Sequence, residues 1–449
     1  MHSLKKIIAC LLLSSTVQAQ SPAITSWLQN TTVLGTYYVN GNPTPVSNNT
    51  LVNCQKVEYS TNFVYVTTKG IPSYPTGPFL DGNPSIAQNQ NAIFSFPLNP
   101  TPNTGTLKAT TMGNIGVFIN GVALFDSRDG VSWKNSTSAL AGGPIGGQGD
   151  LVWNRDAIRA EKAGFDCSKG HPANGNYHHH QNPSAFKFDI NVTSTVCNPY
   201  DANGLYVIDS NQHSPLIGFA YDGYPVYGAY GFKNADGSGG IVRIKSSYQL
   251  RNITARTTDA SGNTVTAGPA VNTTYPLGYF IEDYEFIAHT GQSDYLDVHN
   301  GRFCVTPEYP AGTYAYFCTV DANWNSAYPY AVGKTFYGNW ANRKVTSVTE
   351  STTIYTPTGI NETAFNQLSF TVYPNPTSDM ILIQAGNLVQ YDLNIDLFDL
   401  TGKTVAQTTL AKGSSLAYFD TQTLHEGIYF AKIYNGDFKT TQKVVVQKK

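Results

Sequence analysis

Four of the nine histidines in this 449-residue chain lie in one short segment, GHPANGNYHHHQNP, at positions 170–183. On an extended strand successive side chains point to opposite faces, so His178 and His180 would share one face while His179 points the other way. A His-x-His pair on a strand directs two imidazoles to one point, and imidazole binds zinc, copper, iron and nickel. The segment therefore predicts a metal site built on His178 and His180.

The fourth histidine, His171, is separated from the others by the turn sequence PANGN, in which Asn-Gly readily takes positive φ. In a regular hairpin with this five-residue loop, His171 would pair with Tyr177 and share the face of His179. A bulge or an irregular turn would be needed to bring His171 to His178. We still include His171 among the candidate ligands because it lies so close in sequence.

Two further candidates, His213 and Asp222, lie downstream in HSPLIGFAYDGYPVYGAYG. Three histidines with a carboxylate would leave a position on the ion for water or substrate, which is typical of catalytic rather than structural zinc sites. Asp166, just before the turn, is a candidate to orient a ligand imidazole. The candidate ligands are His171, His178, His180, His213 and Asp222.

The sequence leaves the chemistry of such a site open. A zinc ion would lower the pKa of bound water for hydrolysis, with an acidic residue as base, whereas copper would favour redox chemistry. The competing interpretation is a non-catalytic cell-surface protein that binds a glycan or a protein through its 29 tyrosines, with purely structural histidines. The residues do not decide whether the protein is an enzyme.

A second group of possible metal ligands is formed by Asp294, Asp297 and Asn300. Carboxylate and amide oxygens are the ligands that calcium prefers. The spacing is not that of an EF-hand, and acidic turns are usually only solvated. Calcium binding at these three residues is therefore expected from their residue types alone.

The composition excludes some classes of partner and favours a mainly β fold. The formal net charge is −2 and charged residues make up 13% of the chain, so nothing suggests nucleic acid or a membrane surface as a partner. Short apolar runs such as NFVYVTTKGIPSYP and IGVFINGVALF are punctuated by Gly, Pro and Asn, as in strands joined by turns. No Gly-x-Ser-x-Gly motif or P-loop ending supports nucleophilic hydrolysis or phosphate binding.

The beginning of the chain has the pattern of a secretory signal peptide. Two lysines precede a short apolar run, and residues 1–19 end in a plausible Val-Gln-Ala cleavage site. No later segment is long and apolar enough to span a membrane. The protein is therefore expected to be exported and to have no membrane span.

Without the signal peptide, five of the six cysteines remain in an oxidising compartment. The pairs closest in sequence are Cys304–Cys318 and Cys167–Cys197, and we expect these two disulfides. Cys54 would remain free.

The composition changes after about Trp340. Residues 341–368 are rich in Thr, Ser and Asn, which predicts an exposed linker, although TTIY within them fits a short strand. Residues 369–449 alternate apolar and polar positions between Thr-Gly and Asn-Gly turns, which predicts a small Ig-like β-sandwich. Residues 25–340 would form one large β-rich domain or two packed sheets.

The C-terminal segment resembles the type A sorting domain of the type IX secretion systems of Bacteroidota. The matching pieces are YPNP at 373–376, IDLFDLTGKTV, GIY at 427–429 and the closing KVVVQKK. The resemblance implies that a Sec signal takes the chain to the periplasm and that the secretion machinery binds this domain and directs it across the outer membrane. The cargo would then be released or attached to the cell surface.

Residues 25–340 resemble the YHYH domain, a family of exported bacterial proteins. The matching pieces are GIPSYPTGPF, IGVFINGVALF, DCSKGHPANGNYHHHQNP, HSPLIGFAYDGYPVYG and LDVHNGRFCVTPEYPAGTYAYF. Tyr177, His178 and His180 match the motif that names the family, and His179 stands where the family has its second tyrosine. This departure falls on the face opposite the predicted ligand pair, so His179 is not counted as a ligand. The resemblance implies no established reaction.

Overall fold

The computed structural model describes residues 20–42, 44–80, 85–184, 204–206, 208–357, 368–386, 389, 391–411, 414–435 and 438–448. The predicted signal peptide, residues 1–19, lies outside the described residues. Strands dominate the described part of the chain, which confirms the mainly β prediction. The helices are short: α1 (Pro22–Thr25), α2 (Ala157–Glu161) and the 3-10 helices η1 (Asn135–Thr137), η2 (Gly143–Ile145), η3 (Lys162–Gly164) and η4 (Ile281–Asp283). Among the described residues, no helix has the length and apolar character needed to cross a membrane.

The larger of two main sheets has eight strands and carries the histidine segment at one edge. Its order is β11 (His171–Ala173), β12 (Asn176–His179), β7 (Ala123–Phe125), β6 (Asn114–Phe118), β13 (Leu216–Ala220), β14 (Pro225–Tyr227), β20 (Thr313–Phe317) and β19 (Gly301–Cys304). β12 is parallel to β7 and β14 is parallel to β20, while the other neighbours are antiparallel. The continuous apolar run of β13 is buried at every position, as expected for a strand covered on both faces.

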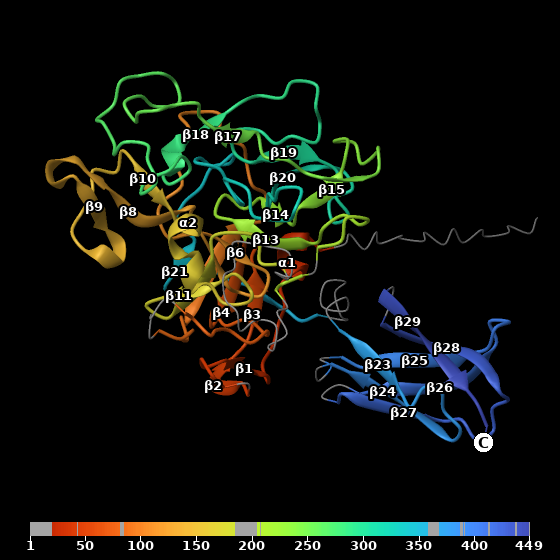
Figure 1. Cartoon of the computed structure of the whole chain (residues 1–449). Coiled ribbons are helices and arrows are strands. Elements are labelled where there is room, and N and C mark those ends of the chain that lie inside the picture. Colours follow the sequence, from red (N-terminus) through yellow and green to blue (C-terminus); the bar gives the residue numbers. More distant parts are fainter. Residues whose placement is uncertain are drawn as a thin grey trace, which may run out of the picture.

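A five-stranded antiparallel sheet packs against the eight-stranded sheet (Figure 1). Its order is β21 (Lys344–Val345), β5 (Ala92–Pro97), β4 (Phe63–Thr68), β3 (Cys54–Tyr59) and β22 (Thr353–Tyr355). Trp27 is buried between the layers, with its ring centroid 5.5 Å from Phe96 of β5 and 5.4 Å from Phe219 of β13. The N-terminal domain is therefore built from two packed sheets that share one hydrophobic core.

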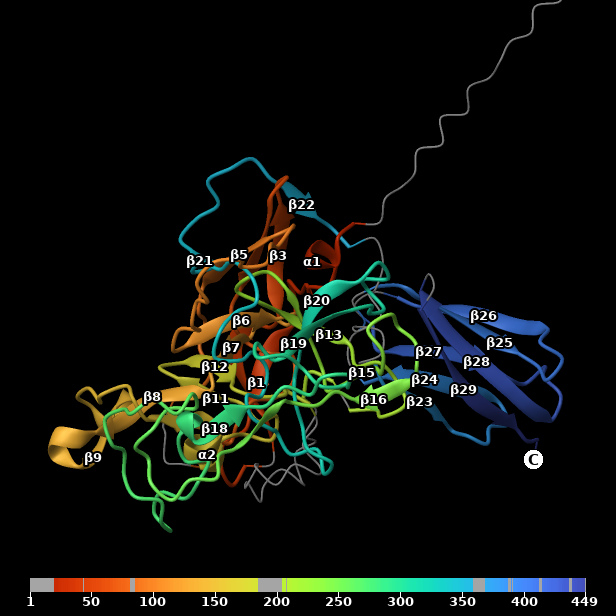
Figure 2. The same ribbon diagram turned by 90° about the horizontal axis from the view of Figure 1, so that it is seen from above.

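Shorter strands surround this core. They form the pairs β1 (Leu34–Tyr37) with β2 (Val46–Leu51), β15 (Tyr230–Phe232) with β16 (Ile241–Arg243) and β17 (Tyr248–Leu250) with β18 (Tyr284–Phe286), and the small sheet β10 (Asn154–Asp156), β8 (Arg128–Lys134) and β9 (Ala139–Gly142). β10 leads directly into α2, which lies close to β11 in both views (Figures 1 and 2). This connection places the end of α2 beside the histidine segment.

The first half of the predicted linker is part of the five-stranded sheet. The short strand allowed at TTIY is confirmed as β22, whereas the exposed linker expected for the rest of residues 341–357 was wrong, because β21 lies there. β21 pairs with β5 and β22 pairs with β3, and the two strands form the edges of the sheet. Thr352 also donates a hydrogen bond to Glu58 at 2.7 Å, and Tyr65 donates one to Glu350 at 2.5 Å. Edge strands face water, so their composition is as polar as that of a linker. Residues 358–367 lie outside the described residues.

The C-terminal segment forms the predicted Ig-like β-sandwich, with a hydrophobic core of its own. One sheet has the order β23 (Phe370–Tyr373), β24 (Met380–Ala385), β27 (Leu416–Asp420), and the other β26 (Thr404–Leu410), β25 (Leu393–Phe398), β28 (Gly427–Asn435), β29 (Phe438–Val446). In β24 the alternation in the sequence places Ile381 and Ile383 inside the sandwich. The Asn375 side chain covers the edge of β29 by pairing with the backbone of Lys443 and Val445.

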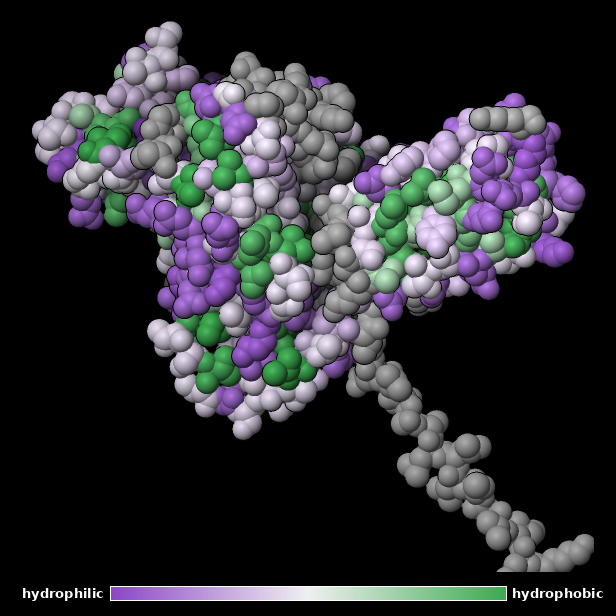
Figure 3. All heavy atoms as spheres, turned by 90° about the horizontal axis from the view of Figure 1, so that it is seen from below, coloured by the Kyte–Doolittle hydropathy of each residue, from purple (hydrophilic) through white to green (hydrophobic). Residues whose placement is uncertain are grey.

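The face drawn in Figure 3 has no single patch that marks a functional site. Figure 3 shows polar residues mixed with small apolar patches on both bodies, as on most globular proteins. The buried polar groups are therefore the better guide to function.

The predicted disulfide between Cys304 and Cys318 is wrong, because both thiols are free. In the β19–β20 pair, the residue opposite Cys304 precedes Cys318 by five positions, about 17 Å along the strand. A disulfide requires Cα atoms within about 7 Å of each other. Cys54 is free, as predicted. Cys167 is disulfide-bonded, and its pairing with Cys197 stays a prediction because Cys197 lies outside the described residues.

The turn between β13 and β14 holds a fully buried carboxylate, Asp222. Asp222 Oδ2 accepts hydrogen bonds from the Tyr316 hydroxyl at 2.6 Å and from the Gly338 backbone N–H at 2.8 Å. Burial raises the pKa of Asp222 to about 6, although these hydrogen bonds act to lower it. The carboxylate thus ties this turn to β20 and to the segment that precedes β21.

A chain that ends at residue 340 should be less stable than one that ends at residue 357. The shorter chain lacks β21 and β22, so both edges of the five-stranded sheet lose their hydrogen-bonding partners. We expect a loss of roughly 2–4 kcal/mol in the free energy of unfolding, measured by urea denaturation of chains that both start at residue 20. Equal stability of the two chains would restore the linker prediction.

Replacement Asp222→Asn should remove part of the pH dependence of stability. The folded pKa of about 6 exceeds the ordinary value of 3.8, so the wild type loses roughly 2 kcal/mol as the pH rises from 4 to 6. Asn still accepts from Tyr316 but does not titrate, so the variant should gain stability relative to the wild type over this range in urea denaturation. The exposed Asp150→Asn serves as the control, and a variant that follows the wild-type slope contradicts the expectation.

Candidate metal centre

The hairpin of β11 and β12 has a two-residue turn. Asn174 and Gly175 have φ of 49° and 81°, and two positive φ values are characteristic of a type I′ turn. The register consequently pairs His171 with His178. Residues directly opposite each other on antiparallel strands share a face, so no bulge is needed. The predicted five-residue loop was wrong, and its correction brings His171 to the face of His178.

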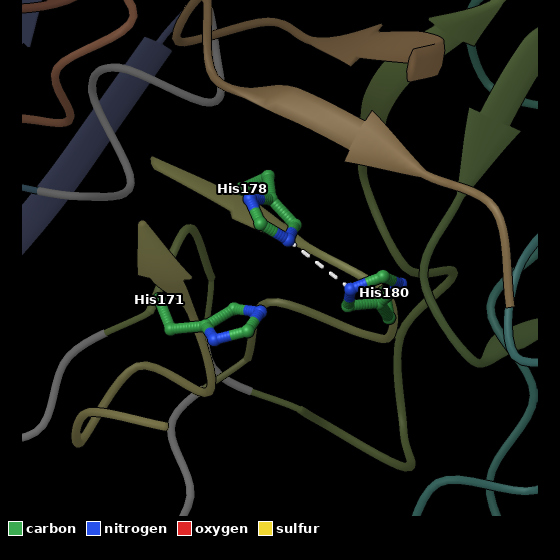
Figure 4. Close-up of side chains that lie close together, drawn as sticks. All are labelled: His171, His178 and His180. Carbon is green, nitrogen blue, oxygen red and sulfur yellow. Dashed lines mark hydrogen bonds between the residues drawn. The ribbon is translucent and has the colours of Figure 1, made fainter. Parts of the chain in front are cut away.

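Three imidazoles converge on this face, those of His171, His178 and His180 (Figure 4). One ligand atom of each lies within 4.8 Å of the others. The Nε2 atoms of His178 and His180 are only 3.1 Å apart, which confirms that these two side chains share a face of the strand. All three residues are buried.

Backbone carbonyls orient the two closest imidazoles. His178 Nδ1 donates to the Asn176 carbonyl at 2.8 Å, and His180 Nδ1 donates to the Asp126 carbonyl at 2.5 Å. A carbonyl only accepts hydrogen bonds, so Nδ1 carries the proton in each neutral ring and Nε2 presents a lone pair. With both rings neutral, two lone pairs would face each other at 3.1 Å, an arrangement that requires a proton or a cation between them.

Glu161, the last residue of α2, brings a carboxylate to the same point. Its Oε2 atom lies 3.1 Å from His180 Nε2 and 3.3 Å from His171 Nε2. Sequence analysis missed Glu161 because it stands ten residues before His171, in AIRAEKAG, and carries no local signal of its own. Only the packing of α2 beside the hairpin makes it a neighbour of the histidines.

The protonation of these groups is strongly coupled. Burial alone would raise the pKa of Glu161, but hydrogen bonds and charge interactions with His171 and His180 hold it far below its usual range. Burial lowers the pKa of His178 well below its ordinary value, and the neighbouring histidines lower it further. His180 is buried too, yet its contact with Glu161 raises its pKa. The site thus combines an ionised carboxylate with at least one neutral imidazole.

Aromatic rings hold the imidazoles in place. Phe125 stacks on His178 with ring centroids 3.7 Å apart. Phe165 meets His171 edge-on at 5.0 Å. These contacts restrict the rotation of both ligand rings and thereby favour one fixed geometry.

The opposite face of β12 has a different network. His179 Nε2 is 2.8 Å from the Tyr74 hydroxyl, so His179 does not point to the cluster. Tyr177 donates a hydrogen bond to Asp166 at 2.8 Å, and Asp166 also accepts from three backbone N–H groups. Asp166 therefore belongs to this network and, contrary to expectation, does not orient a ligand imidazole. Backbone carbonyls orient the ligand imidazoles instead.

Two of the five candidate ligands lie elsewhere. His213 precedes β13, three strands away from β12 in the sheet order, and its ring packs against Tyr227 and Phe232. Its Nδ1 donates to the Ser214 carbonyl at 2.7 Å. The Asp222 carboxylate lies in the turn that follows β13, where it accepts hydrogen bonds from other residues. The structure brings together His171, His178 and His180 but neither of these two.

The expected calcium ligands have separate protein partners. Asp294 forms an ion pair with Lys245 at 2.7 Å, whereas Asp297 accepts a hydrogen bond from Tyr314 at 2.9 Å. The Asn300 amide group donates to two backbone carbonyls. Calcium at these residues stays a prediction from residue type.

Comparison with known proteins assigns both parts of the chain. A family model described as YHYH protein matches residues 93–329, which include Glu161 and the histidine hairpin. A model described as secretion system C-terminal sorting domain matches residues 371–447. No curated protein matches the chain. The sorting domain indicates type IX secretion, with a location at the cell surface or outside the cell and an interaction with the secretion machinery. The chain thus belongs to the YHYH protein family and carries a secretion sorting domain at its C-terminal end.

Proposed function

We propose that the YHYH domain of this secreted protein binds one transition-metal ion, preferably zinc, through His171, His178, His180 and Glu161. The approach of the Nε2 atoms of His178 and His180 to 3.1 Å is the observation that carries this proposal. A metal ion would take the place of the proton shared between them and form two coordinate bonds. The Glu161 Oε2 atom, 3.1 Å from His180 and 3.3 Å from His171, would supply the negative charge that offsets part of the charge of the ion.

Three of the six distances between the four ligand atoms fit a tetrahedral ion. Zinc binds imidazole nitrogen and carboxylate oxygen at about 2.0–2.2 Å, so neighbouring ligand atoms of a tetrahedron lie about 3.3–3.5 Å apart. The observed separations are 3.1 Å between the Nε2 atoms of His178 and His180, and 3.1 and 3.3 Å from Glu161 Oε2 to His180 and His171. The ligand atoms of the three histidines lie within 4.8 Å of one another, so the remaining separations would have to shorten to complete the coordination.

The four ligands support a structural role for zinc first. Three histidines and one carboxylate are four protein ligands and complete the tetrahedron of zinc, as in sites that stabilise a fold, so the open position expected from the sequence would not arise while all four are bound. The ion would join α2 to the β11–β12 hairpin at the edge of the larger sheet. Copper could use the same imidazoles, since they suit both metals.

One observation favours hydrolysis as a second role. The Glu161 side chain is 20% exposed, whereas those of His171 and His180 are 7% and 2% exposed. Glu161 thus has the most exposed side chain of these three, although its Oε2 atom is buried, and its release would free a position for water. Zinc would lower the pKa of that water, and the released carboxylate would be available as the base.

Zinc content should follow the proposed ligands. The protein purified without a histidine tag should contain about one equivalent of zinc by mass spectrometry of the metal. The double replacement His178→Ala and His180→Ala should lose it, because two of four ligands are gone. His213→Ala is the matched control, since His213 is a partly buried histidine outside the cluster. Metal loss in the control alone, or no metal in the wild type, would contradict the proposal.

Removal of the metal should destabilise the fold. A ligand that binds only the folded state at a thousand times its Kd adds about 4 kcal/mol to the free energy of unfolding. We expect a strong chelator to lower the thermal midpoint of the wild type and to leave that of the His178→Ala, His180→Ala variant unchanged. Differential scanning calorimetry measures both, and equal shifts in the two proteins would rule out a stabilising metal at this cluster.

A further inference from the structure

Tyr330 has a backbone conformation that bulky residues rarely adopt. Its φ is 76°, in the left-handed region. Hydrogen bonds on both sides hold it there: its N–H donates to the Ala327 carbonyl at 2.9 Å, and its carbonyl accepts from Thr319 N–H at 2.9 Å. Strained residues of this kind persist where the surrounding structure imposes them, and they concentrate at functional sites.

The strained backbone directs the Tyr330 side chain to helix α2. The ring packs in a buried cluster with Ile158 of α2 and with Phe165, which in turn contacts the ligand His171. The hydroxyl donates a hydrogen bond to Asp156 Oδ2 at 2.6 Å. Tyr330 therefore meets α2 both through apolar packing and through one polar contact.

Asp156 is the residue on which α2 begins. Its other carboxylate oxygen accepts from the Arg159 backbone N–H at 3.2 Å, which caps the first turn of the helix. α2 has only five residues, so it is too short to be stable without such contacts. The Tyr330–Asp156 bond is buried and therefore restrains the whole helix, including Glu161 at its far end.

We propose that Tyr330 is a positioning residue for the metal centre. Through Asp156 it fixes α2 so that the Glu161 carboxylate reaches the imidazoles of His171 and His180. This inference rests on the proposed metal-binding function. Groups that orient a ligand from outside the coordination sphere typically contribute about 10–100-fold to metal affinity.

Tyr330→Phe is the direct test, with Tyr328→Phe as its matched control. Both tyrosines are buried in the same cluster. Among the described residues the Tyr328 hydroxyl has no hydrogen-bond partner, so its removal breaks no such bond there. In the full-length protein, competition with a chromophoric chelator should show zinc binding at least about tenfold weaker for Tyr330→Phe, and unchanged for Tyr328→Phe.

A second variant distinguishes the loss of the Tyr330–Asp156 hydrogen bond from an effect of the Tyr330 replacement on folding. Asp156→Ser retains a good helix cap but is too short to reach Tyr330. It should weaken zinc binding as Tyr330→Phe does. With cobalt in place of zinc, the visible spectrum of both variants should shift toward that of Glu161→Ala, because the carboxylate is the ligand that is lost.

The Glu161→Ala background separates positioning from a general loss of stability. Once Glu161 is absent, Tyr330→Phe should cause no further loss of zinc affinity. A loss that persists in this background, or equal affinities of Tyr330→Phe and Tyr328→Phe, would overturn the positioning role alone. A wild type that binds no zinc would instead overturn the metal-binding function on which the inference rests.

Discussion

The register of one hairpin determines where the chemistry of the N-terminal domain lies. Asn174 and Gly175 both take positive φ, so β11 and β12 are joined by two residues and His171 faces His178. A shift of one residue would turn His171 to the opposite face, because side chains alternate along a strand. The three-imidazole cluster, and the approach of Glu161 to it, both depend on that register.

Burial then requires that the polar groups of this arrangement find partners within the protein. Polar atoms that are removed from water need partners, and an uncompensated one costs several kcal/mol. At this edge of the sheet, two imidazole lone pairs and a carboxylate oxygen face one another. The same rule accounts for the restraint on α2, since the buried carboxylate of Asp156 is satisfied by Tyr330 and by the helix backbone. The ligand cluster and the helix that serves it are therefore consequences of one physical requirement.

Secretion and the candidate chemistry reside in separate parts of the chain. The sorting domain and the YHYH domain have their own hydrophobic cores. In the sorting domain, Asn375 satisfies the exposed edge of β29, and in the YHYH domain the strands β21 and β22 close the edges of the five-stranded sheet. The sheet edges of each part are thus paired or covered by residues of that same part, as expected of independent folding units.

Local periodicity allowed the sequence by itself to determine the mainly β class, the C-terminal sandwich and the shared face of His178 and His180. These features depend on residues that are neighbours along the chain, where alternation every two residues holds. Only the tertiary structure decided the rest. The turn length brought His171 to the cluster, the packing of α2 brought Glu161, and strand pairing turned a polar segment into sheet edges. These contacts either join residues that are far apart in the sequence or depend on the conformation of a single turn. The amino-acid composition does not indicate which of these residues will be in contact.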